Sequence, residues 1–139
     1  MRKKALDAAL GAAYDGSLDQ QVAAIPSLIA HLGHEDADLA LLYLLQHPWN
    51  TGPILEAGCL LLSNGSDQAL RLFAVAWHLT EVAEEWSGAD TLCDAVRAGE
   101  ASGINVVRWA SLVEGSSPAA NAGAQSICEW LTGGEQLPG

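Results

Sequence analysis

The segment Ile25–Gln46 constrains the fold more than any other part of the sequence. Its first half carries Leu28, Ile29 and Leu32 at the spacing of one helix face, and a glycine then ends that helix. After an acidic turn, residues 39–45 read LALLYLL, with apolar side chains on nearly every side of a second helix. A helix that is apolar all round must be buried among others. The segment therefore predicts a helical hairpin within an all-α fold.

Start and stop signals divide the rest of the chain into helices as well. Ser17 with Gln20 three residues later forms a capping box, and Ser66 and Ser117 stand ahead of two further helices. Pro26 is expected to kink or split the second helix. Sustained alternation of period two does not occur, so no strand is predicted. The expected helices are Lys3–Tyr14, Leu18–Leu32, Asp36–Gln46, Pro53–Ser63, Asp67–Trp86, Asp90–Ala98, Ile104–Glu114 and Pro118–Leu131.

The fifth expected helix is the longest, and Ser87-Gly88 is expected to end it. One apolar row on it is Leu70, Phe73 and Trp77, and a second runs from Leu72 through Val75, Leu79 and Val82 to Trp86. Tryptophans at core spacing, Trp77 and Trp109, are expected to be buried, and Trp130 is expected to seal the last helix. Trp49 and Trp86 are expected nearer the surface. On the seventh helix the side chains expected to point inward are Ile104, Val107 and Ala110 or Ser111.

Length and composition favour a single domain. The chain has 139 residues, half of them hydrophobic, and is rich in Ala and Leu, which favours helix over strand. We expect one α-helical domain over residues 1–132 and a flexible tail over residues 133–139. The start, MRKK, could open a signal peptide, but Asp7 interrupts the stretch that follows, which indicates an amphipathic helix. No apolar run approaches the ~20 residues of a membrane span, so a cytoplasmic protein is expected.

Charge is distributed very unevenly along the chain. Arg2, Lys3 and Lys4 supply half of the six cations, and the remaining residues carry three cations against 17 anions, a balance of −14. Such a surface repels nucleic-acid phosphates and anionic membranes, so neither is an expected partner. It attracts a basic protein, although acidity can also simply keep a small apolar protein in solution.

The predicted hairpins repeat. Ile25–Leu45 is similar to Ile54–Leu79, and Thr91–Val113 is a looser copy. The motifs are a first helix that contains a proline, an acidic turn, and a second helix of the form Asp67, Leu70, Arg71, Ala74. On these residues the chain resembles HEAT-like repeat proteins. The resemblance implies about eight helices in antiparallel pairs, arranged as a right-handed stack or a compact bundle, and a scaffold that binds macromolecules.

Candidate sites for metal or covalent chemistry are few. His31 and His34, followed by Glu35, could share a helix face as metal ligands, or could serve a helix end and a turn. Cys59, Cys93 and Cys128 are odd in number and widely spaced, which indicates free thiols in a reducing compartment. No nucleophile motif and no phosphate-binding loop occurs, so neither a catalytic site nor a cofactor is expected.

The strongest candidate for a binding site is a cluster of acidic residues with a tryptophan among them. It can be a solvated helix end, or it can dock a basic partner with the tryptophan as an anchor. We favour a non-enzymatic protein-binding module, most concretely a bacterial immunity protein that covers a basic cleft on a toxin. Alternatives are a metal- or small-molecule-binding protein that uses His31, His34 and Glu35, and a scaffold subunit of a larger assembly. The predicted partner-binding residues are Glu81, Glu84, Glu85, Trp86, Asp90 and Asp94.

Overall fold

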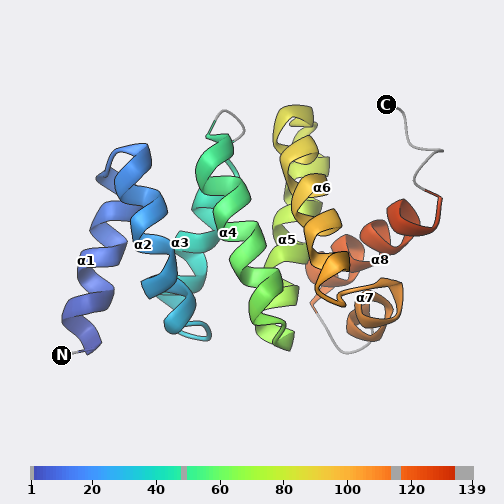
Figure 1. Ribbon diagram of the computed structural model, residues 1–139, viewed down its shortest axis with the longest axis horizontal. Coiled ribbons are helices and arrows are strands. Elements are labelled where there is room, and N and C mark those ends of the chain that lie inside the picture. The colour runs from blue at the N-terminus through green and yellow to red at the C-terminus, as the bar shows by residue number, and fades with distance from the viewer. Residues whose placement is uncertain (1, 48–49, 114–116, 134–139) are drawn as a thin grey trace.

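The computed structural model describes residues 2–47, 50–113 and 117–133. Within these ranges the chain forms eight α-helices and no strand, which confirms the predicted all-α class (Figure 1). The helices are α1 Arg2–Asp15, α2 Leu18–Ala30, α3 Glu35–Leu45, α4 Thr51–Asn64, α5 Asp67–Ala83, α6 Trp86–Ala101, α7 Val106–Val113 and α8 Pro118–Thr132. No helix in these ranges has the length and apolar character needed to cross a bilayer.

The helices stack in two layers that run from α1 to α8 (Figure 1). In one layer α4 lies between α2 and α6, and in the other α3 and α5 lie between α1 and α8. The predicted hairpins α2–α3 and α4–α5 stack on one another through both layers. The third copy differs, because the short α7 packs chiefly on α8, and α8 is the helix that lies along α5.

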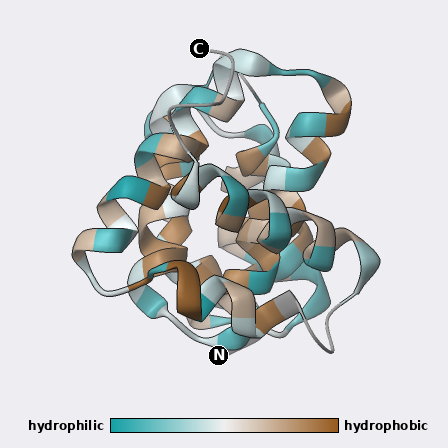
Figure 2. Ribbon diagram, turned by 90° about the vertical axis from the view of Figure 1, so that its right-hand side faces the viewer, coloured by the Kyte–Doolittle hydropathy of each residue, from teal (hydrophilic) through white to brown (hydrophobic). Residues whose placement is uncertain are grey.

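The core fills the space between the layers. Ile25, Leu28, Leu41, Leu44 and Leu45 of the first hairpin are buried, as its apolar pattern predicts, but Leu39 is 52% exposed, so the second helix is not buried on every side. The buried residues belong to one hydrophobic cluster that extends from α1 to α8. Figure 2, which looks at the molecule from the α8 end, shows most of the hydrophobic ribbon toward the middle and hydrophilic ribbon at many of the turns. Burial of one continuous apolar cluster is the main force that holds the stack together.

Aromatic rings lock α5 to the C-terminal helices. Phe73 lies with its ring centroid 5.8 Å from that of Trp109, and the Trp77 and Trp130 rings meet edge to face at 5.9 Å. Gly123 of α8 faces the carbonyl of Ala74, and a Cβ atom at Gly123 would overlap that carbonyl. The absence of a side chain at Gly123 therefore sets how closely α8 approaches α5. The predicted burial of Trp77, Trp109 and Trp130 is confirmed.

Several helix boundaries agree with the predicted signals. The Ser17 hydroxyl accepts from the Gln20 amide and the Gln20 side chain accepts from the Ser17 amide, which completes the capping box. The Ser66 and Ser117 hydroxyls accept from the amides of Ala69 and Ala120 and so cap α5 and α8 without the reciprocal bond. Pro26 was expected to kink or split α2, yet the helix runs through it from Leu18 to Ala30. A split is therefore wrong, because burial of α2 outweighs the lost backbone hydrogen bond.

The prediction that Val107 and either Ala110 or Ser111 of α7 point toward the core is wrong. Val107, Ala110 and Ser111 of α7 are exposed, whereas Trp109 and Leu112 are buried. Since Trp109 has by far the largest apolar surface on this short helix, its burial decides which face turns inward.

The predicted tail over residues 133–139 lies, apart from Gly133, outside the described residues, and so does Trp49.

Candidate partner-binding surface

The predicted acidic cluster surrounds a tight turn between α5 and α6. Glu84 ends α5 in the left-handed conformation, with φ 57°, and its amide donates to the Glu81 carbonyl. The Glu85 amide donates back to the Thr80 carbonyl at 3.1 Å. This double hydrogen bond ends the helix three residues earlier than predicted. Trp86 therefore begins α6, and Ser87-Gly88 lies inside that helix instead of ending one.

Two large apolar side chains protrude on either side of this turn. Val82 is 68% exposed and Trp86 is 61% exposed. The predicted row is buried at Leu72, half-buried at Val75 and Leu79, and exposed at Val82, before α5 ends. The prediction that Trp86 lies nearer the surface is confirmed. Exposed tryptophan is the side chain most enriched at the energetic centre of protein interfaces.

Five acidic residues stand close to the two apolar side chains in the sequence, at the end of α5 and in the first turns of α6. Glu81, Glu84, Glu85, Asp90 and Asp94 are all exposed. Three of them, Asp90, Asp94 and Glu81, lie near the half-buried Cys93 thiol. Burial and these three charges raise the pKa of that thiol to about 11, against a lowering by Arg97. We name these five acids with Val82 and Trp86 the turn patch.

A hydrogen-bond relay fixes one acid of the turn patch to the core. The Trp77 indole Nε1 donates to the Ser126 hydroxyl at 3.0 Å, and that hydroxyl donates to a Glu81 carboxylate oxygen at 2.8 Å. Trp77 is buried, so the carboxylate is tied to the packed α5–α8 interface. Arg97 is the cation nearest to the acids of the turn patch in the sequence. Its guanidinium carbon lies over the Trp130 ring, 5.0 Å from the ring centroid. A prepositioned side chain loses less entropy when a partner binds.

The shape of this region suits a macromolecule better than a small ligand. A hollow beside the turn, between Leu45, Leu79 and Gly88, has a volume of about 30 Å³. Pockets for drug-sized ligands measure about 300–1,000 Å³. The hollow holds roughly one water molecule, so the exposed side chains around it, and not the hollow, form the contact surface.

The candidate metal ligands have structural contacts. His31 ends α2, with its Nδ1 2.8 Å from the Ser27 carbonyl oxygen. His34 caps α3, where its Nδ1 accepts from the Asp36 amide at 3.2 Å. Among the residues that the structure describes, no three His, Cys, Asp or Glu side chains gather as a metal site. The two histidines therefore serve the ends of neighbouring helices.

The cysteines have the character of protonated thiols. Cys59, Cys93 and Cys128 are free and half-buried. Burial, with a nearby carboxylate in each case, raises the pKa of all three. Since the thiolate is the nucleophile, a raised pKa works against covalent chemistry at neutral pH.

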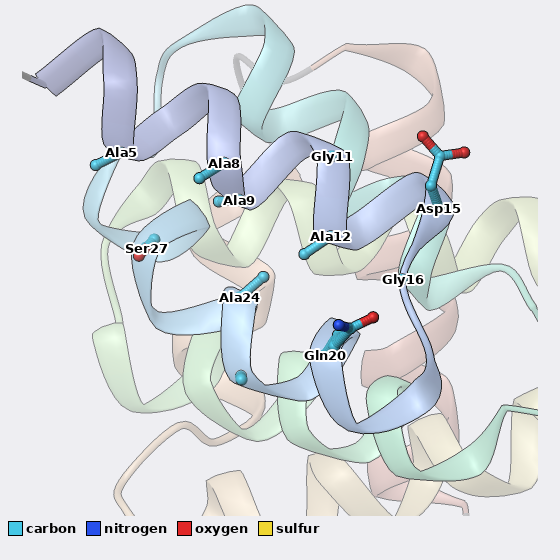
Figure 3. Close-up of a pocket in the computed structure, with 11 residues that line it drawn as sticks. Ala5, Ala8, Ala9, Gly11, Ala12, Asp15, Gly16, Gln20, Ala24 and Ser27 are labelled. Atoms are coloured by element: carbon cyan, nitrogen blue, oxygen red, sulfur yellow. The ribbon is translucent and has the colours of Figure 1, made fainter.

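A second hollow, which sequence reasoning did not single out, lies between α1 and α2 (Figure 3). It is an open groove of about 730 Å³. Small apolar side chains such as Ala5, Ala8 and Ala24 line it, and Asp15 and Gln20 lie at one end. Ala5, Ala8 and Ala12 on α1 and Ala23 and Ser27 on α2 recur at helical spacing, a sequence signal that could have indicated it.

The chain has no counterpart among the proteins to which it was compared: no protein-family model, no curated protein and no solved structure matches it.

Proposed function

We propose that this chain is a non-enzymatic protein-binding module and that its turn patch docks a basic protein partner. The observation that carries the proposal is the exposure of Val82 and Trp86 on a segment whose five acidic side chains are exposed as well. A protein interface needs an apolar side chain that loses its contact with water on binding. It also needs charged side chains that select the partner. The turn patch supplies both within a few residues.

The concrete form that we favour is an acidic inhibitor of the immunity-protein kind, acting in the cytoplasm of a bacterium. The balance of −14 beyond residue 4 supports this form, because it attracts a basic cleft of the type that binds anionic substrates. In such a complex Trp86 would enter the cleft while Glu85 and Asp90 pair with its cations. The cleft would then be closed to its substrate.

Stacked helical hairpins support the related proposal that the scaffold is an irregular HEAT-like repeat. α2–α3 and α4–α5 stack side by side in both layers, which leaves the turns along one edge free to carry a binding surface. No observation favours the alternative of a site built on His31, His34 and Glu35.

Co-purification from the source organism tests the proposal. The tagged chain is compared with a Glu85→Lys, Asp90→Lys variant and with a control, Glu56→Lys, Glu100→Lys, which changes the net charge equally at exposed sites elsewhere. The wild type and the control are expected to retain the same basic protein, and the turn-patch variant to retain at least about tenfold less. Equal retention by all three would refute docking at the turn patch.

A further inference from the structure

The first two helices leave one end of the stack uncovered. α1 packs on α2 and α3, and α2 also packs on α4, so both have neighbours on one side (Figure 1). The groove of about 730 Å³ lies on their other side, since residues of α1, α2 and the turn between them line it (Figure 3). Terminal units of stacked helices normally end in a polar outer face. Here the outer face is largely alanine.

The exposed face of α1 has a charge at each end and small residues between. Lys4, Ala8, Gly11 and Asp15 follow one another at i, i+4, i+7 and i+11, and all four are exposed. At about 100° per residue these positions fall on one helix face. A Cβ atom built on Gly11 meets no described atom within 4 Å, so the middle of the face is open.

We propose that this face binds a second copy of the chain in a two-fold symmetric, antiparallel dimer. A two-fold axis that sets Lys4 opposite Asp15 of the second copy also sets Ala8 opposite Gly11. The two Lys4–Asp15 ion pairs then lie on either side of the two places where Ala8 meets Gly11 and the helix backbones come close. Both copies use the same surface, as an isologous contact requires. The distance between packed helices depends on the side chains at the contact, and alanine and glycine permit the closest approach.

The opposite charges at the two ends of α1 are the reason that the occupant is a copy of the same chain. The chain beyond residue 4 has a balance of −14, so two copies repel one another over most of their surfaces. Arg2, Lys3 and Lys4 place half of the cations at the start of α1. An antiparallel contact sets Lys4, at this end of α1, over Asp15 of the other copy at the opposite end of α1.

The contact is expected to be weak and dependent on concentration. Helices of 13 and 14 residues are about 20 Å long, so a face of two helices covers only a small part of the molecule. Contacts of this size fall at the low end of specific interfaces. The proposal is independent of the turn patch, which lies at the α5–α6 turn and is left uncovered.

Sedimentation or light scattering of the full chain over a range of concentrations tests the dimer. At an ionic strength of about 0.15 M, which screens the long-range repulsion more than the close ion pairs, the mass is expected to rise from 14.5 kDa toward twice that value. Lys4→Asp and Asp15→Lys each turn attraction into repulsion at two symmetric places and are expected to weaken association roughly tenfold. Because the double variant Lys4→Asp, Asp15→Lys pairs opposite charges again, it is expected to recover wild-type association.

Two further variants separate the contact from general effects. Gly11→Leu is expected to fold, because the site is open in one copy, and to abolish the dimer by a clash with Ala8 of the second copy. Glu100→Lys changes the net charge as Asp15→Lys does, at an exposed site on α6, and is expected to leave the dimer intact. A wild-type mass of one chain at every concentration, or a double variant no better than the single ones, would overturn the proposal.

Discussion

At the scale of single residues, the close contact between α8 and α5 depends on a missing side chain. Gly123 lets α8 rest against the backbone of α5 at Ala74, beside the ring contacts of Trp77 and Trp130. Gly58 and Gly99 lie against side chains instead, Gly58 against Ala95 and Phe73 and Gly99 against Leu62. Substitution at such positions forces helices apart, whereas substitution at an open glycine only restricts the unfolded chain.

Gly123→Ala is expected to destabilise the fold by about 2–3 kcal/mol, because the new methyl group overlaps the Ala74 carbonyl. Gly11→Ala is the matched control. Its methyl group meets open space within a helix, so it is expected to stabilise the fold by about 0.5–1 kcal/mol. Urea unfolding followed by circular dichroism measures both. Equal effects of the two substitutions would contradict the packing of α8 on α5.

The Cys93 thiol gives the molecule a specific alkaline sensitivity. Its pKa is raised from 9.0 to about 11 in the fold by burial and by Asp90, so the folded state favours the protonated thiol. The associated stability is complete below pH 9 and is lost as the pH rises from 9 to about 11. Unfolding midpoints over this range are expected to fall more steeply for the wild type than for Cys93→Ala. Parallel slopes would show that Cys93 lies in a more exposed or less acidic place.

At the scale of elements, one arginine fastens α7 to the α4–α5 turn. A terminal nitrogen of Arg108 donates to the Asp67 carboxylate at 2.6 Å and to the Gly65 carbonyl at 3.0 Å. Asp67 also meets Arg71 at 3.8 Å, the i, i+4 pair expected from the repeat pattern. The bonds of Arg108 therefore join α7 to the turn before α5, and Arg108 lies 41 residues after Asp67 in the sequence.

Arg108→Ala is expected to cost about 1–2 kcal/mol of stability, since the Gly65 carbonyl loses a charged donor along with the ion pair. Asp67→Ala and the double variant complete a mutant cycle. The pair itself is partly exposed, so a coupling of about 0.5–1 kcal/mol is expected. A coupling of zero, measured by thermal or urea unfolding, would contradict the contact.

Helix boundaries could be predicted from the sequence where a single local pattern determines them. They could not be predicted where two patterns favour different boundaries or faces. Serine caps and the apolar hairpin located α2, α3, α5 and α8 to within a few residues, because local hydrogen bonds and continuous apolar faces act alone there. The α5–α6 turn was missed, since Glu84 in the left-handed conformation leaves no mark in the sequence. Trp109 is buried and Val107 is exposed because of the residues that pack around α7, and the spacing of apolar residues in the sequence does not reveal those neighbours.

At the scale of the whole molecule, the two surfaces proposed here lie on different helices. The α1–α2 face is an end of the stack, and the turn patch belongs to the edge where α5 passes into α6 (Figure 1). The sequence indicated the five acids of the turn patch and an exposed Trp86, but it did not indicate that Val82 protrudes. Exposure of Val82 and the relay from Trp77 to Glu81 both depend on how α5 meets α6 and α8.

Electrostatics act over the whole molecule in the proposed complex. A balance of −14 over most of the chain steers a basic partner toward the turn patch. The association rate is therefore expected to fall by about tenfold or more between about 50 mM and 500 mM salt, measured by stopped-flow mixing. A rate independent of salt would leave the acidity of the chain without a part in binding.

The affinity of the purified partner for the Trp86→Ala variant tests the central claim most directly. Val107→Ala is the control, because Val107 is 76% exposed on α7 and lies outside the turn patch. Titration calorimetry is expected to give a dissociation constant about 30-fold higher for Trp86→Ala, equivalent to ~2 kcal/mol, and an unchanged value for Val107→Ala. An unchanged dissociation constant for Trp86→Ala would contradict docking at the α5–α6 turn.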